Sequence, residues 1–107
     1  MLIILGSVVT RADTHAEALR LSHEHVARSL QEPGCLRHSV MPDFAHPQRL
    51  VFVEQWASIE DLLRHFRLPA SIAFARAIGA LAAQPPEMKI YDAREMELPR
   101  THPDGGR

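Results

Sequence analysis

The sequence predicts an α+β domain of the ferredoxin-like class, a β-α-β-β-α-β sandwich with an antiparallel four-stranded sheet. Two observations predict it. Segments rich in Ile, Leu and Val alternate with segments whose apolar residues recur at helical spacing. Stretches containing proline or glycine separate these segments. The 107 residues suffice for one domain, which we place at residues 1–98, followed by a flexible tail over 99–107.

The first third of the chain supplies a strand and a helix. Residues 1–10 are rich in Ile, Leu and Val, as a buried strand should be. Thr14 and Glu17 stand three residues apart and predict a capping box at the start of the helix. Pro33-Gly34 predicts its end. The inner face of this helix is predicted to carry Ala16, Leu19, Val26, Ala27 and Leu30.

Two strands with different patterns come next. The segment CLRHSVM alternates, which places Leu36, His38 and Val40 on one face. After a turn-rich loop, RLVFVEQW has apolar residues at both alternating sets of positions, which predicts a central strand covered on both faces. One of these faces carries Leu50, Phe52, Glu54 and Trp56.

The last elements are a broken helix and a strand. Ser58 and Asp61 predict a second helix start, and Pro69 interrupts that helix. An Ala-rich helix follows and ends before Pro85-Pro86, and residues 87–98 complete the sheet. The inner face of the Ala-rich helix is predicted to carry Ile72, Ala75, Ile78, Gly79 and Ala82.

Composition limits the classes of partner. Hydrophobic residues make up 46% and charged residues 23%, with a net charge of −1, so we expect a globular protein that binds no nucleic acid. The apolar N-terminus is too short for a membrane helix and lacks a charged leader, so we expect no membrane partner. The single Cys35 offers no internal disulfide or zinc motif and fits a cytoplasmic protein. The second apolar face of the central strand, with Val51 and Val53, predicts a homodimer through facing sheets.

Several motifs together resemble one family. They are EPGCLRHSV, FVEQW, SIEDLLRHF and the proline-broken helix, and they are similar to the antibiotic biosynthesis monooxygenase family of quinol-monooxygenase-like dimeric α+β barrels, over about residues 2–91. The resemblance implies cofactor-independent oxygenation of phenols, anthrones or hydroquinones by molecular oxygen, in a pocket between the helices and the sheet. His38 stands where members often have Tyr, and Ala70 stands where many have a second His.

Oxygenation without a metal or flavin requires the substrate itself to be the reductant. Its deprotonated form gives up an electron more easily, so the site needs a base, a donor for the oxyanion and an apolar pocket. We assign His65 and His38 as candidate bases, and the Trp56 N–H as a donor to a substrate oxygen. Glu54 would orient a histidine or hold a substrate hydroxyl. The apolar walls would be Phe52, Leu36, Phe66, Ile72 and Phe74. No spacing of the histidines predicts a metal site.

Trp56 and Glu54 also have structural interpretations. Trp56 at a strand end is typical of a core anchor. Glu54 would equally form an ion pair with an arginine such as Arg37 or Arg64.

The two histidines have structural alternatives as well. His65 stands four residues after Asp61 and would form a solvated surface pair with it, whereas His38 would be a satisfied core histidine. The functional alternatives are a small-molecule isomerase that uses the same base, because one fold hosts many chemistries, and a non-catalytic ligand-binding module.

Overall fold

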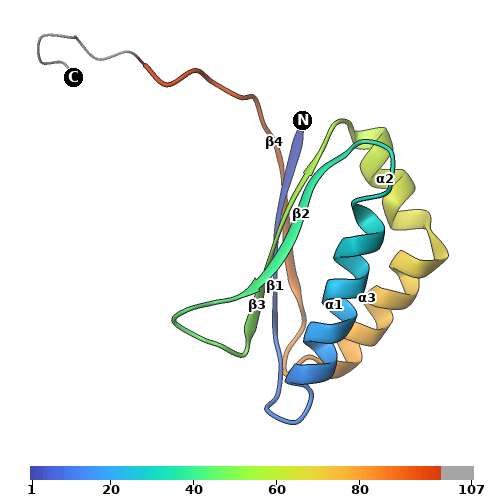
Figure 1. Cartoon of the computed structure of the whole chain (residues 1–107), viewed down its shortest axis with the longest axis vertical. Coiled ribbons are helices and arrows are strands. Elements are labelled where there is room, and N and C mark those ends of the chain that lie inside the picture. Colours follow the sequence, from blue (N-terminus) through green and yellow to red (C-terminus); the bar gives the residue numbers. More distant parts are fainter. Residues whose placement is uncertain (100–107) are drawn as a thin grey trace, which may run out of the picture.

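The chain forms a four-stranded antiparallel sheet with three helices on one of its faces (Figure 1). The computed structural model describes residues 1–99. The elements in chain order are β1 (Leu2–Val9), α1 (His15–Ser29), β2 (Cys35–Pro42), β3 (Arg49–Trp56), α2 (Ile59–Arg67), α3 (Pro69–Leu81) and β4 (Glu87–Asp92). The strand order β2-β3-β1-β4 places β3 inside the sheet, so both the predicted fold class and the predicted central strand are confirmed. No helix within residues 1–99 combines the length and apolar character needed to cross a bilayer.

Two apolar clusters occupy the side of the sheet that the helices cover. At one end, the fully buried Trp56 packs with Ile4 and Leu62. The other cluster contains Leu50 and Phe52 from β3 together with three further buried residues, Val8, Ala18 and Ile78. Glu54 lies between the two clusters along β3 and is only 5% exposed.

Helix α1 buries small and polar side chains instead of the predicted apolar stripe. Its inner face consists of Ala18, Ser22, His25 and Ser29. The Ser22 hydroxyl donates to the Ala18 carbonyl at 2.7 Å and the Ser29 hydroxyl donates to the His25 carbonyl at 2.8 Å, so both hydroxyls can be buried. The predicted stripe is right in part: Leu19 packs against the core and Val26 is half-buried, whereas Ala16, Ala27 and Leu30 are exposed. The small side chains allow α1 to lie close to its neighbours, and His25 points into the domain.

The two predicted helix caps have different outcomes. Ser58 caps α2 as predicted, because its hydroxyl oxygen accepts a hydrogen bond from the Asp61 amide at 3.2 Å. Thr14 occupies the N-cap position of α1, but the predicted capping box is wrong. The Thr14 hydroxyl donates to the Leu81 carbonyl at 2.7 Å, and Glu17 pairs with an arginine one turn later. A tertiary contact between the start of α1 and the end of α3 therefore replaces the local cap.

A bulge at the start of β2 changes which residues face the helices. Cys35 is opposite Trp56 and Arg37 is opposite Gln55, so Leu36 is an extra residue. Leu36 is 57% exposed, and its predicted place on the His38 face is wrong.

The C-terminal half differs from its prediction in two places. Helix α3 begins at Pro69, so the proline break is confirmed, but α3 buries Ser71 and Ile78, whereas Ala75 and Gly79 are exposed. The last strand ends at Asp92 instead of residue 98, and the following segment leaves the body of the domain (Figure 1). Beyond residue 99, the predicted tail lies outside the described residues.

Candidate active site

A cavity of about 520 Å³ lies between the helices and the sheet. Its volume falls in the range of small-molecule pockets. The apolar lining side chains are Val8, Phe52, Phe66, Ile72, Phe74, Ala75, Ile78, Pro86 and Met88. The polar lining residues are Ser7, His25, His38, Glu54, His65, Ser71, Arg76 and Glu87. The cavity is therefore a largely apolar chamber with a group of titratable side chains on its wall.

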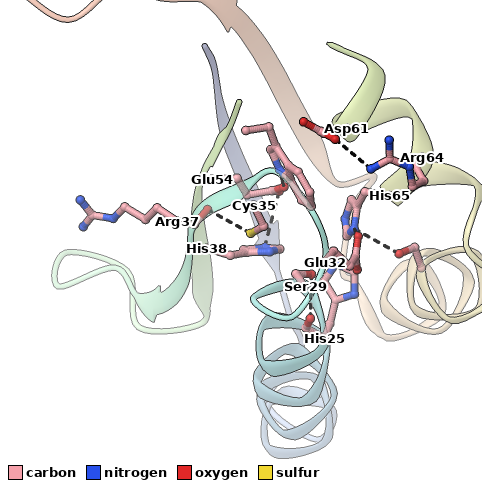
Figure 2. A network of polar contacts seen from close by, with 12 residues as sticks. His25, Ser29, Glu32, Cys35, Arg37, His38, Glu54, Asp61, Arg64 and His65 are labelled. Atoms are coloured by element: carbon pink, nitrogen blue, oxygen red, sulfur yellow. Dashed lines mark hydrogen bonds and ion pairs between the residues drawn. The ribbon is translucent and has the colours of Figure 1, made fainter. Parts of the chain in front are cut away.

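Three imidazoles from three elements gather on this wall (Figure 2). His25 comes from α1, His38 from β2 and His65 from α2, and each is at most 6% exposed. The ring centroids are 5.3 Å apart for His25–His38, 5.2 Å for His25–His65 and 6.1 Å for His38–His65. The His25 ring stacks on Phe74 at 4.0 Å with an interplanar angle of 5°, which holds its orientation. Within residues 1–99, no three candidate ligands are arranged to hold a metal ion.

His65 is paired with Glu32. The His65 Nδ1–H donates to Glu32 Oε1 at 2.8 Å, and the Ser71 hydroxyl lies 3.4 Å from the same nitrogen. With Nδ1 carrying the proton, Nε2 is left with a lone pair that can accept one, and the carboxylate would stabilise the resulting imidazolium. This arrangement is that of a general base with an orienting partner.

A tight turn brings Glu32 to this position. Gly34 adopts a φ of 80°, which favours glycine, and the Gly34 carbonyl accepts from the Ala57 amide at 2.8 Å. The alternative of a surface pair between His65 and Asp61 is wrong. Asp61 instead accepts from Arg64 at 2.8 Å, while His65 is 3% exposed.

The second carboxylate near the imidazoles, Glu54, is held by Trp56. The Trp56 Nε1–H donates to Glu54 Oε1 at 2.9 Å, and Trp56 is fully buried. This contradicts the predicted role of Trp56 as a donor to a substrate oxygen, because its one N–H is already used and its ring does not line the cavity. The predicted pairing of Glu54 with an arginine is also wrong.

His38 has unsatisfied hydrogen-bonding capacity. Its Nε2 lies 3.6 Å from Glu54 Oε2, which is too long for a hydrogen bond, and neither ring nitrogen has a partner among the described residues. The His38 side chain has no exposed surface. His38 is therefore not the satisfied core histidine of the structural alternative. A polar ligand would satisfy the hydrogen-bonding capacity of its ring nitrogens.

Burial keeps two of the imidazoles neutral. It lowers the pKa of His38 to about 4, with the nearby His65 as the second cause. It lowers the pKa of His25 to about 3, with His38 and His65 adding to the effect. Burial also raises the pKa of Glu54. These shifts favour uncharged groups on the cavity wall, and neutral imidazoles can both donate and accept hydrogen bonds.

Cys35 is not an activated nucleophile. Burial raises the pKa of its thiol, and the carboxylates of Glu32 and Glu54 raise it further. The thiol therefore remains protonated at neutral pH.

The structure brings together most of the side chains predicted for the site. His38, Glu54 and His65 line the cavity, as do four of the predicted apolar walls, Phe52, Phe66, Ile72 and Phe74. The predicted wall position of Leu36 is wrong, because the bulge turns it outward.

Three members of the site, His25, Glu32 and Ser71, were not predicted from the sequence. The spacing Ala18-Ser22-His25-Ser29 was a usable signal for His25, because these positions share one helical face. Nothing local marks Glu32, which pairs with a residue 33 positions away.

The fold and the site define a ferredoxin-like domain with an acid–base cavity between its helices and its sheet. Comparison with known families then identifies it. The model of the antibiotic biosynthesis monooxygenase family matches residues 1–77, and the chain belongs to this family.

Individual proteins are also similar to this chain. The chain is 29% identical over 96 residues to an uncharacterised Synechocystis protein, covering 90% of this chain and 65% of the relative. A Deinococcus radiodurans crystal structure assigned to the antibiotic biosynthesis monooxygenases superimposes with a TM-score of 0.87 at 24% identity, covering 94% of this chain and 99% of that one. Another crystal structure with the same family name has a TM-score of 0.82 at 25% identity, with coverage of 89% and 100%. These likenesses establish the shared fold.

Proposed function

We propose that this protein is a cofactor-independent monooxygenase that oxidises a small aromatic, quinol or anthrone-like substrate with molecular oxygen. The observation that carries the proposal is the Glu32–His65 hydrogen bond of 2.8 Å on the wall of a mostly apolar cavity. Membership of the antibiotic biosynthesis monooxygenase family supports it.

His65 would act as the base. Its Nε2 takes the proton of a substrate hydroxyl or activated C–H, and Glu32 stabilises the imidazolium. The substrate anion then reduces dioxygen, one oxygen atom enters the product as a carbonyl, and the other leaves as water with the two hydrogens that the substrate lost. The single N–H of the neutral His38 ring, which has no partner among the described residues, would donate to a substrate oxygen as its charge develops. The apolar walls keep bulk water from the anion.

A homodimer through facing sheets is part of the proposal. The sheet face without helices exposes Leu5 to 45%, Met41 to 45% and Tyr91 to 46%. Covering apolar area of this kind contributes about 25 cal/mol per Å². Sedimentation should show a dimer that Leu5→Asp dissociates, and a monomeric wild-type protein at micromolar concentration would contradict it.

Oxygen consumption tests the activity. Protein treated with a chelator should consume dioxygen when supplied with anthrone, and one anthraquinone and one water should form per dioxygen, with one oxygen atom of the dioxygen in the new carbonyl. His65→Ala should slow the reaction by about a hundredfold or more, and His23→Ala, on the exposed side of α1, should not change its rate. Consumption no faster than that of buffer, or equal in the wild type and His65→Ala, would refute the proposal.

One observation favours a second candidate, a proton-transfer isomerase. Two imidazoles with centroids 6.1 Å apart, each near a carboxylate, suit removal of a proton from one carbon and its return to another. Such an enzyme would exchange substrate C–H for deuterium in heavy water without dioxygen. A protein that binds the aromatic ligands but performs neither reaction is a ligand-binding module.

A further inference from the structure

We propose that Gly6 is a specificity-determining residue. Because it has no side chain, it leaves room on the sheet side of the cavity for the far ring of a fused-ring substrate. The inference rests on the proposed function, because it concerns the substrate of the same cavity. It follows from the position of Gly6 in the sheet, the conformation of its backbone and its distance from the imidazoles.

Gly6 is the one gap in a row of larger side chains. The helix-facing positions of β1 are Leu2, Ile4, Gly6 and Val8, and both Ile4 and Val8 are buried. Gly6 is opposite Phe52 on β3 and opposite Met88 on β4. Gly6, Phe52 and Met88 all line the cavity. The space that a side chain at Gly6 would occupy is therefore part of the cavity volume.

The backbone does not require glycine at this position. Among residues 1–99, Gly34 is the glycine with a positive φ, so the backbone of Gly6 has a conformation that other residues also adopt. A Cβ added at Gly6 would lie 3.4 Å from the Glu87 carbonyl oxygen and 3.6 Å from Phe52 Cβ, which are ordinary contacts. Glycine inside a strand destabilises it by about 0.5–1 kcal/mol relative to alanine. A glycine that neither φ nor crowding demands is consistent with a use for the empty space.

The distance from Gly6 to the reactive end sets the size of the substrate. Ile4, the neighbouring helix-facing residue on β1, pairs with Glu54, which pairs with His38, so β1 is two strands away from β2. Neighbouring strands are about 4.8 Å apart and Gly6 lies two residues, about 6.6 Å, further along β1 than Ile4, so the Cα atoms of Gly6 and His38 are roughly 12 Å apart. A single ring held at the imidazoles would not reach Gly6, whereas a system of about three fused rings would.

The test compares ligand size in matched glycine variants. Gly6→Val fills the space at Gly6, Gly6→Ala fills part of it, and Gly79→Ala is the control, because a Cβ at Gly79 on α3 meets nothing within 4 Å. Calorimetry without dioxygen measures the Kd of hydroquinone, dihydroxynaphthalene and dihydroxyanthracene, and thermal unfolding confirms that each variant folds. Both alanine variants should unfold at a higher temperature than the wild type.

Only the Gly6 variants should change the size preference. Gly6→Val should weaken dihydroxyanthracene binding by about tenfold and hydroquinone binding by less than about twofold, with Gly6→Ala between it and the wild type. The proposal is overturned if Gly6→Val weakens all ligands equally or leaves the ratio unchanged. It is also overturned if the wild type binds three rings no more tightly than one. Because binding is measured without dioxygen, absence of oxygenase activity would refute the proposed function and leave this ratio interpretable.

Discussion

Within residues 1–99, two imidazole–carboxylate pairs border the cavity, and they differ in geometry. His65 and Glu32 form a hydrogen bond of 2.8 Å, whereas the nearest nitrogen and oxygen of His38 and Glu54 are 3.6 Å apart. Glu54 is instead bonded to Trp56 in the apolar end of the domain. The first pair is assembled before a ligand arrives, whereas the second has capacity that a ligand would satisfy. The same two residue types are therefore suited to two tasks, proton transfer and substrate binding.

The largest expected effect comes from removing the assembled base. His65→Ala should lower kcat by about a hundredfold to ten-thousandfold, because general-base catalysis contributes this much. The rate of dioxygen uptake at saturating substrate measures kcat. If the His23→Ala control loses as much activity, the effect is not specific to the pair.

Removing only the charge of the first pair should have a smaller effect. Glu32→Gln keeps the shape of the side chain, and kcat should fall by about tenfold to hundredfold, since hydrogen bonds to charged groups contribute about 1.5–3 kcal/mol. KM should change little, because Glu32 would position His65 and not the substrate. Glu60→Gln, on the exposed side of α2, is the matched control. A rise in KM with constant kcat would contradict this role.

Replacing the histidine of the second pair should raise stability, whereas replacing the histidine of the first pair should lower it. His38→Leu removes a buried ring with two unpartnered nitrogens, so the free energy of unfolding should rise by about 1–3 kcal/mol. Ligand affinity should fall in the same variant. His65→Leu should instead lower stability, because it leaves Glu32 without its partner. Urea denaturation measures the free energy of unfolding of both variants. If the two substitutions change it equally, the two pairs do not differ in the way proposed.

The smallest expected effect is on the pH dependence of stability. The folded-state pKa values of His25 and His38, about 3 and about 4, lie below the ordinary 6.5. Below pH 6.5 and above these folded-state values, the unfolded chain binds more protons than the folded chain. The contribution of His25 and His38 to stability is therefore fully present above pH 6.5 and is lost as the pH falls toward about 4 for His38 and about 3 for His25. The raised pKa of Glu54 acts oppositely in acid. His38→Leu should therefore show a shallower fall in melting temperature between neutral and acid pH, and an unchanged slope would show that His38 does not contribute to this pH dependence.

Local signals predicted the elements well, but not the side chains that meet across them. The Ser58 cap and the Pro69 break depend on neighbours within a few residues, and both are confirmed. Thr14 has the same local signal as Ser58, yet its hydroxyl bonds to Leu81, a residue 67 positions away. The bulge that turns Leu36 outward has no local marker, because it depends on the pairing of β2 with β3.

By itself, the sequence determined the order of the elements, the central position of β3 and the family resemblance, since these depend on apolar periodicity, capping and turn residues. The tertiary structure decided which imidazole meets which carboxylate. Packing of α1, β2 and α2 brings His25, His38 and His65 together, and a turn places Glu32 against His65 while Trp56 binds Glu54. Such contacts depend on distances of a few ångströms between segments remote in the chain, which residue spacing along the chain does not encode.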